Sequence, residues 1–410
     1  MPAYVETSES RRRFLKWLYA SPLLAHYGAR GFAAEPPASV DVPAQEPISS
    51  PADAINVFDF EPVARRNVPP AHFGYMASGI DDEVTLRANR AGFARFQLRP
   101  RRLNDVSKVD MSTDILGVRY STPIAIAPTG GNKAYHPDGE VAVARAAKSG
   151  GHLQILSTAA NTSVEAATKE RGAPIWFQLY ASPSWTVAQA LVKRAEKAGC
   201  PVVAVTVDRV AGRNQETFAR LRRLDNRPCA TCHSPTLQES VKRKPNYDGI
   251  SLSGLTSLQS ANMDWDFIKR LRDATQMRIV LKGILTQEDA RLAVENGVDG
   301  IIVSNHGARS EDNGLSTIEA LPEIVDAVRG RVAVLVDSGF RRGTDIVKAL
   351  AMGAQAVCIG RPYLWGLGAF GQPGVEKVLE ILRTELRVAM QQCGVRSPGE
   401  LTSAFVRRTW

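Results

Sequence analysis

Eight short apolar runs, each ending in polar or glycine residues, constrain the fold of this chain more than any other feature. They lie at Ile124–Thr129, Leu153–Thr158, Ile175–Tyr180, Val202–Asp208, Ile279–Gly283, Gly300–Asn305, Val332–Asp337 and Ala356–Gly360. Their valine, isoleucine and leucine content is typical of strands buried on both faces, as in parallel sheets. Between them lie segments whose apolar residues recur at helical spacing, for example Pro183–Ala198 and Gln287–Asn296. We therefore predict an α/β fold, a (β/α)₈ TIM barrel with an N-terminal arm.

An open, doubly wound sheet is the alternative. It would normally carry a dinucleotide-binding G-x-G-x-x-G after its first strand, and the chain has Pro-Thr-Gly-Gly-Asn at 128–132 instead. One connection of the predicted barrel is unusually long, because about seventy residues separate Asp208 from Ile279. Barrel enzymes use long loops at this end of the strands to cover the active site.

Composition excludes several classes of protein. Of the 410 residues, 44% are hydrophobic and 23% charged, which is a globular balance and not that of a disordered or collagen-like chain. No apolar run reaches the roughly 18 residues that would span a bilayer, although peripheral contact with a membrane stays open. The net charge of +9 includes no basic cluster interleaved with aromatics, so we expect no nucleic-acid partner.

The N-terminal segment resembles a twin-arginine export signal. Residues 10–16 read Ser-Arg-Arg-Arg-Phe-Leu-Lys, a weakly apolar stretch follows, and Gly-Phe-Ala at 31–33 resembles a cleavage site. A basic amphipathic helix is the alternative. We expect a signal at 1–33, a Pro-, Ala- and Ser-rich linker at 34–52 and a catalytic domain at 53–410. We also expect a protein that is periplasmic or otherwise exported by the twin-arginine route, already folded around a cofactor.

Polar residues concentrate at the ends of the predicted strands, where barrel enzymes place their chemistry. Two glycine- and arginine-rich loops follow the last two strands, Asp-Ser-Gly-Phe-Arg-Arg-Gly at 337–343 and Gly-Arg-Pro at 360–362. Backbone N–H groups of such loops, with arginine nearby, form the usual phosphate cradle of a barrel. The sequence therefore predicts a phosphate-bearing cofactor.

These motifs resemble the FMN-dependent 2-hydroxy-acid oxidase and dehydrogenase family of glycolate oxidase, lactate oxidase, lactate monooxygenase and mandelate dehydrogenase. The most specific is Ser-Asn-His-Gly-Ala-Arg at 304–309, supported by Lys-Gly at 282 and Ile-Gly-Arg-Pro at 359. The resemblance runs from about residue 53 to the C-terminus. It implies FMN as the cofactor and oxidation of an (S)-2-hydroxy acid to the 2-oxo acid.

The resemblance also implies roles for individual residues. His306 would be the base and Asp208 the carboxylate that stabilises its charged form, while Lys282 would stabilise the reduced flavin. Arg309 and Tyr75 would bind the substrate carboxylate and Tyr180 the substrate oxygen. The positions expected to contact FMN are Pro128, Thr129, Gly130, Ser157, Gln178, Thr206, Lys282, Ser304, Asp337, Gly339, Arg341, Gly360 and Arg361. No metal site is expected.

Three positions depart from the glycolate oxidase pattern. Ala159 stands where that subgroup has an aromatic residue, Gly130 stands where many oxidases have alanine, and Arg213 lies two positions before the expected arginine. Ala159 is expected to enlarge the pocket for the substrate side chain.

The long connection contains Cys229-Ala-Thr-Cys232-His233, the pattern of covalent c-type haem attachment. A haem held there, with His233 as its proximal ligand, is one reading, and a disulfide or a pair of free thiols is the other. Cys200, Cys358 and Cys393 stand in apolar contexts and are expected to be inert core residues.

The sequence thus predicts an enzyme that oxidises a small 2-hydroxy acid and passes electrons from FMN to oxygen, a quinone or a cytochrome. We also expect a homo-oligomer. The alternatives are an FMN-dependent isomerase on a similar barrel and a non-catalytic flavin-binding protein.

Overall fold

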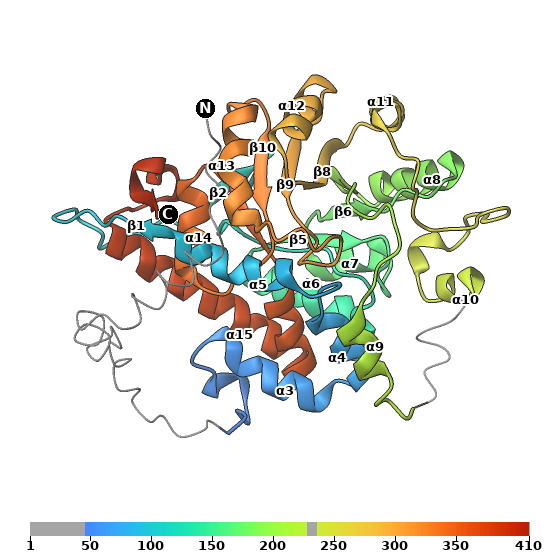
Figure 1. Cartoon of the computed structure of the whole chain (residues 1–410), viewed down its shortest axis with the longest axis horizontal. Coiled ribbons are helices and arrows are strands. Elements are labelled where there is room, and N and C mark those ends of the chain that lie inside the picture. The colour runs from blue at the N-terminus through green and yellow to red at the C-terminus, as the bar shows by residue number, and fades with distance from the viewer. Residues whose placement is uncertain (1–45, 228–235, 410) are drawn as a thin grey trace, which may run out of the picture. The chain divides into compact units, whose positions relative to one another are not determined.

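The eight predicted strands are present in the computed structural model, which describes residues 46–227 and 236–409 (Figure 1). They are β4 (Ile124–Ile126), β5 (Leu153–Ser157), β6 (Trp176–Leu179), β7 (Val202–Thr206), β8 (Arg278–Ile284), β9 (Gly300–Val303), β10 (Ala333–Val336) and β11 (Ala356–Ile359). Neighbouring strands pair in parallel, and β11 pairs with β4 to close the barrel. The predicted (β/α)₈ fold is confirmed, and the open sheet is wrong because no edge strand is left in this barrel.

Each barrel strand buries both of its faces. Along β7, Val203 and Val205 belong to the cluster of buried residues that includes the helices, whereas Val202 and Ala204 belong to a second cluster with Trp176. Because side chains alternate across a strand, the second cluster fills the barrel interior. This two-sided burial explains why the strands read as continuous apolar runs.

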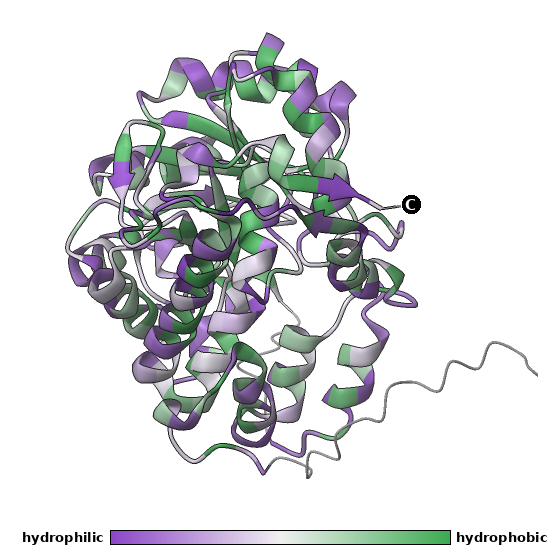
Figure 2. Cartoon of the chain, turned by 90° about the vertical axis from the view of Figure 1, so that its left-hand side faces the viewer, coloured by the Kyte–Doolittle hydropathy of each residue, from purple (hydrophilic) through white to green (hydrophobic). Residues whose placement is uncertain are grey.

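Helices follow the strands and cover the barrel. They are α6 (Gly139–Gly150), α7 (Val164–Arg171), α8 (Trp185–Lys197), α11 (Trp265–Ala274), α12 (Gln287–Glu295), α13 (Thr317–Val328), α14 (Gly343–Ala351) and α15 (Arg361–Cys393). Figure 2 shows hydrophilic and hydrophobic residues on the same outer helices. In α11, for example, Ile268 and Leu271 are buried while charged residues face outward, the pattern of a helix with one packed face.

An N-terminal arm precedes the barrel. It contains the 3₁₀ turns η1 (Pro51–Asp53), η2 (Val57–Asp59) and η3 (Gly92–Arg95), and the helices α3 (Phe60–Asn67), α4 (Pro70–Ala77) and α5 (Val84–Ala91). Helix α3 packs on α15. The hairpin of β2 (Thr113–Ile115) and β3 (Val118–Tyr120) then contributes Ile115 and Tyr120 to the interior cluster.

The C-terminal end of the described chain pairs with a strand that precedes the barrel, in a small antiparallel ribbon. Strand β1 (Phe96–Leu98) pairs with β12 (Val406–Arg408), which follows the 3₁₀ turns η7 (Pro398–Glu400) and η8 (Ser403–Phe405). The C-terminal segment is thereby fixed to the residues that lead into the barrel.

The long connection between β7 and β8 contains α9 (Glu216–Arg222), α10 (Leu237–Val241) and the turn η6 (Pro245–Tyr247) before α11. Helix α9 lies beside α4, as Figure 1 shows. Ring edges of Phe218 and Tyr75 meet there, with centroids 6.0 Å apart. This part of the connection therefore lies against the helix that carries Tyr75.

Candidate active site

A cavity opens among the loops that follow the barrel strands. The cavity is lined by the predicted residues Tyr75, Pro128, Thr129, Gly130, Tyr180, Lys282, His306, Arg309, Asp337, Gly339, Arg341, Gly360 and Arg361. The strand ends therefore converge, as the barrel topology predicts.

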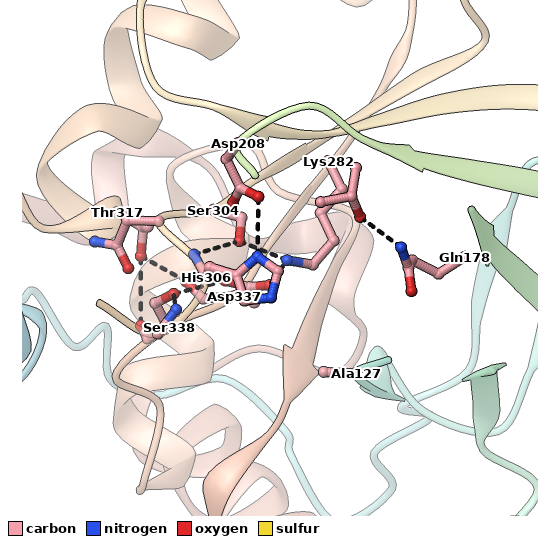
Figure 3. Close-up of polar contacts among 12 residues, drawn as sticks. Ala127, Gln178, Asp208, Lys282, Ser304, His306, Thr317, Asp337 and Ser338 are labelled. Carbon is pink, nitrogen blue, oxygen red and sulfur yellow. Dashed lines mark hydrogen bonds and ion pairs between the residues drawn. The ribbon is translucent and has the colours of Figure 1, made fainter. Parts of the chain in front are cut away.

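His306 lies between Asp208 and Tyr180, which follow two other strands. Its Nδ1 is 2.9 Å from Oδ1 of Asp208, and its Nε2 is 3.1 Å from the hydroxyl of Tyr180 (Figure 3 shows the first contact). Because an ionised carboxylate only accepts hydrogen bonds, Nδ1 carries the proton and Nε2 keeps its lone pair. Burial lowers the pKa of His306 to about 4, although Asp208 raises it, so the imidazole is neutral near pH 7.

The backbone around His306 is held in an uncommon conformation. His306 and Ala308 have φ values of 59° and 64°, in the left-handed region of the backbone that residues other than glycine rarely adopt. Ser304 and Ser338 hydroxyls accept the N–H groups of His306 and Gly307, each at 3.0 Å. Backbone strain of this kind persists where neighbouring groups hold it, and it is concentrated at functional sites.

The side chain of Asn305 supports the same turn. Its Oδ1 accepts the N–H of Ala308 at 3.1 Å, and it exchanges side-chain hydrogen bonds of 2.8 and 2.9 Å with Asn89 on α5. Helix α5 of the N-terminal arm therefore fixes the loop that presents His306.

Lys282 lies at the inner wall of the cavity and is 3% exposed. Its ammonium group donates to Ser304 Oγ at 2.9 Å and lies 3.3 Å from Asp337 (Figure 3). Burial would lower the pKa of Lys282, but Asp337 and Asp208 raise it above its ordinary value. Lys282 therefore stays charged and offers a cation to the cavity.

Four of the residues expected to contact FMN stand beneath the cavity lining. Ser157 Oγ donates to Gln178 Oε1 at 2.9 Å, and Gln178 Nε2 donates to Thr206 Oγ1 at 2.9 Å. Ser304 accepts from Lys282, as described above. These buried hydrogen bonds join the ends of β5, β6 and β7 and fix the side chains at the floor of the site.

Three buried arginines line the other side of the cavity. Arg309, Arg341 and Arg361 donate to backbone carbonyls, for example Arg361 to Met76 at 2.9 Å. In the described part of the chain none of the three forms an ion pair with a carboxylate. Burial lowers the pKa of Arg341 to about 9 and that of Arg361 well below its ordinary value.

Buried cations without acidic partners are costly, and they fit an anionic ligand. Arg341 and Arg361 flank Gly339 and Gly360, where the sequence predicts the phosphate cradle. These residues fit the phosphate of FMN, and their uncompensated positive charge is the structural observation that supports a phosphate there.

Helix α4 brings Tyr75 to the site. Arg309 donates to the carbonyls of Tyr75 and Met76 at 3.4 and 2.8 Å, and its guanidinium lies 5.8 Å from the Tyr75 ring centroid. Arg213 hydrogen-bonds the Tyr75 hydroxyl and donates to the Arg309 carbonyl at 3.2 Å. Burial would raise the pKa of Tyr75, but Arg213 and Arg309 lower it below its ordinary value.

Sequence reasoning missed several residues of the site. Tyr135, Ser338, Phe340 and Leu364 also line the cavity. Ser338 and Phe340 are inside a motif that the sequence does reveal, but Tyr135 and Leu364 lie on a turn and a helix that show no pattern of their own. The apolar residue Cys358 is buried as expected, together with Cys200 and Cys393, but it also borders the cavity.

Cys229, Cys232 and His233 lie outside the described residues, as does most of the N-terminal segment 1–52. The expected haem or disulfide and the signal and linker boundaries stay predictions from the sequence.

Comparison with known proteins agrees with the fold and the site described above. A model of the FMN-dependent dehydrogenase family matches residues 64–408. A peroxisomal (S)-2-hydroxy-acid oxidase of Oryza sativa subsp. japonica is 44% identical over 359 residues, which cover 86% of this chain and 95% of that protein. Glycolate oxidase of Spinacia oleracea is 41% identical over 87% of this chain and 96% of its own length.

Solved structures are similar as well. A mandelate oxidase variant with (S)-mandelic acid shares 38% identity at a TM-score of 0.76, over 87% of this chain and 99% of that one. A variant of a chimeric (S)-mandelate dehydrogenase shares 34% identity at a TM-score of 0.78, over 86% and 99%.

The comparisons correct one expectation from the sequence. A periplasmic protein exported by the twin-arginine route was expected from residues 1–33, but the similar relatives include oxidases named as peroxisomal. The expected location is wrong. The physical reason is that a short basic stretch followed by apolar residues has the same composition in an export signal and in an ordinary basic amphipathic segment.

The family model spans most of the chain, and the motifs described in the sequence analysis stand around one cavity. This protein belongs to the FMN-dependent dehydrogenase family.

Proposed function

We propose that the protein oxidises an (S)-2-hydroxy acid to the 2-oxo acid, with His306 as the base that accepts the proton. The class of reaction, oxidation of a 2-hydroxy acid with FMN, agrees with the family and with the named relatives. The observation that supports the role of His306 best is its position in the cavity, held by Asp208 with Nε2 unprotonated and facing the Tyr180 hydroxyl.

Arg309 has the donors that a carboxylate needs. A guanidinium has five N–H groups, and Arg309 uses three, one on each nitrogen, for backbone carbonyls. One N–H remains on each terminal nitrogen, and two parallel N–H groups are the geometry that binds a carboxylate bidentately. We infer that these two groups bind the substrate carboxylate, with Tyr75 beside them.

The remaining residues prepare the reaction. Nε2 of His306 takes the proton released when the CH–OH group is oxidised, and Asp208 stabilises the imidazolium that forms. The Tyr180 hydroxyl, 3.1 Å from Nε2, orients the substrate oxygen toward the base. Lys282 supplies positive charge at the cavity wall. FMN, when bound, accepts the two electrons of the oxidation.

An external acceptor then takes the electrons onward, and its identity as oxygen, a quinone or a cytochrome is a prediction from the sequence alone. The same holds for a homo-oligomer and for contact with a membrane surface. No helix of the described residues is both long and apolar enough to cross a bilayer.

Anaerobic reduction of the bound flavin by a panel of 2-hydroxy acids tests the proposal. His306→Gln should retain FMN, and its flavin should be reduced at least about 10²-fold more slowly, the usual loss when a general base is removed. His136→Gln is the matched control, because His136 does not line the cavity and its Nδ1 contacts the backbone N–H and the carboxylate of Asp138. Near-normal reduction of His306→Gln would show that another group is the base.

A further inference from the structure

Tyr135 is a buried tyrosine that lines the cavity and takes no part in the proposed proton transfer. The residue is 8% exposed and belongs to the cluster of buried residues around the barrel. Among the residues that the structure describes, none forms a hydrogen bond with its hydroxyl. A tyrosine whose ring is packed and whose hydroxyl has no partner at a cavity wall is suited to binding a polar group of a ligand.

The turn that leads into Tyr135 lies against α4, the helix that carries Tyr75. It is the 3₁₀ turn η4 (Asn132–Ala134), and Nδ1 of His72 donates to the carbonyl of Ala134 at 2.8 Å. His72 and Tyr75 are three residues apart on α4, so they lie on the same side of the helix. This contact places Tyr135 next to Tyr75 at the substrate end of the cavity.

Buried hydrogen bonds also hold the turn from the barrel side. The backbone N–H of Asn132 donates to Oε1 of Glu140 at 3.0 Å, and its side-chain amide donates to the carbonyl of Thr129 at 3.0 Å. Asn132 and Glu140 are both buried. The position of Tyr135 is therefore fixed before a ligand binds, which lowers the entropy cost of a contact with it.

The hydroxyl of Tyr135 keeps its proton at neutral pH. Burial raises the pKa of Tyr135 above its ordinary value, and Tyr75 adds to this shift, whereas Arg309 and Arg361 oppose it. A protonated phenol between these cations is a hydrogen-bond donor for an anion.

A carboxylate bound in the cavity has more acceptor positions than Arg309 and Tyr75 can fill. Its two oxygens have about four lone-pair positions. The two parallel N–H groups of Arg309 take two of them, and the Tyr75 hydroxyl takes a third. An acceptor of a buried charged group that stays unfilled is costly, and Tyr135 offers a donor beside Tyr75.

We propose that the Tyr135 hydroxyl donates a hydrogen bond to the substrate carboxylate and completes the carboxylate site with Arg309 and Tyr75. This inference rests on the proposed function and adds a substrate-binding residue to it. The carboxylate does not change during the oxidation, so the contact stabilises the bound substrate and the transition state equally. Tyr135 therefore contributes to binding and not to the rate at saturation.

Equilibrium binding of unreactive acids to the FMN-loaded protein tests the contact. Acetate, propanoate and butanoate are titrated, and binding is followed by the change in the absorption spectrum of the flavin. Tyr135→Phe removes only the hydroxyl. It should weaken the binding of all three acids by the same factor, about tenfold, as a hydrogen bond to a charged group allows.

Anaerobic flavin reduction by a 2-hydroxy acid gives a second readout. In Tyr135→Phe the substrate concentration for half-maximal reduction should rise about tenfold, while the rate at saturation changes by less than about threefold. Tyr120→Phe is the matched control, because it removes the same hydroxyl from a buried tyrosine of the interior cluster that does not line the cavity. The control should leave both quantities unchanged.

Unchanged affinity for the acids in Tyr135→Phe would overturn the contact. A loss that grows with the length of the acid would also overturn it, because the hydroxyl would then face the substrate side chain. So would weaker binding of FMN with unchanged binding of the acids. In each of these cases, reduction of the parent flavin by 2-hydroxy acids would leave the proposed function standing. If no 2-hydroxy acid reduces the parent flavin, the proposed function itself is wrong.

Discussion

Gly283 allows the carboxylate of Asp208 to reach His306. It follows Lys282 on β8 with φ of +111°, and a Cβ placed on it would lie 2.6 Å from Cβ of Asp208 and 2.8 Å from its carboxyl carbon. These distances are far below van der Waals contact. A methyl group at position 283 therefore has to displace Asp208 from its contact with the imidazole.

Gly283→Ala should slow flavin reduction by on the order of 10²-fold, because misplacing a catalytic group by about 1 Å has effects of that size. Gly297→Ala is the matched control, since Gly297 has a positive φ of +70° but open space around its Cβ position. The control should lose some stability to backbone strain and keep its rate. Equal rates in the two variants would mean that Asp208 does not need its present position.

A second prediction follows from the low pKa of His306. Burial lowers this pKa to about 4, and Asp208 opposes the shift. Because the base works only when unprotonated, the rate constant of anaerobic flavin reduction should be constant near neutral pH and fall as the pH approaches about 4. Asp208→Asn removes the charge that raises the pKa, so its slower reaction should lose activity at a still lower pH.

Rapid-mixing measurements over a pH series, with substrate well below saturation, give the midpoint for the substrate-free enzyme. A fall centred at the ordinary histidine pKa of about 6.5 would show that burial does not control this group.

A residue of the site could be predicted when its signal is local in the sequence. His306 and Arg309 stand in one motif directly after a strand, and the strand end alone places them at the active face. Asn89 could not be predicted, because its partner Asn305 is more than two hundred positions away in the sequence. The contact of Gly283 with Asp208 likewise exists only after β7 and β8 pair.

At the scale of elements, the strands and the presence of an N-terminal arm were predictable, and the helices that pack over the site were not. A strand buried on both faces is a run of apolar residues whatever surrounds it, so β4 to β11 appear in the sequence. Helices α4 and α9 are short, and tertiary packing decides them: a Cβ on Gly74 of α4 would lie 3.0 Å from Leu221 of α9. That close approach brings Phe218 edge to face with Tyr75, which lines the cavity.

At the scale of the whole molecule, binding of FMN and stability of the fold are coupled. The N-terminal arm and the barrel meet at the buried arginines, since Arg309 and Arg361 donate to carbonyls of Met76 and Ser78 at the end of α4. The same guanidiniums carry uncompensated charge. A bound phosphate therefore stabilises the contact between arm and barrel as well as the cofactor site.

Removal of FMN should lower the unfolding temperature, and FMN at about 100 times its dissociation constant should restore roughly 2.7 kcal/mol of unfolding free energy. Riboflavin, which lacks the phosphate, should restore much less.

Arg341→Gln tests the origin of the effect. The variant should bind FMN about 10- to 100-fold more weakly, the loss expected for one charge-assisted hydrogen bond, and bind riboflavin as the parent does. Its apoprotein should be at least as stable as the parent apoprotein, because a buried charge without an acidic partner has been removed. Calorimetric scans of both proteins, with and without each flavin, measure all of these changes. A variant that is destabilised equally in every state would show that Arg341 serves packing on Trp365, 4.6 Å from its guanidinium, and not the phosphate.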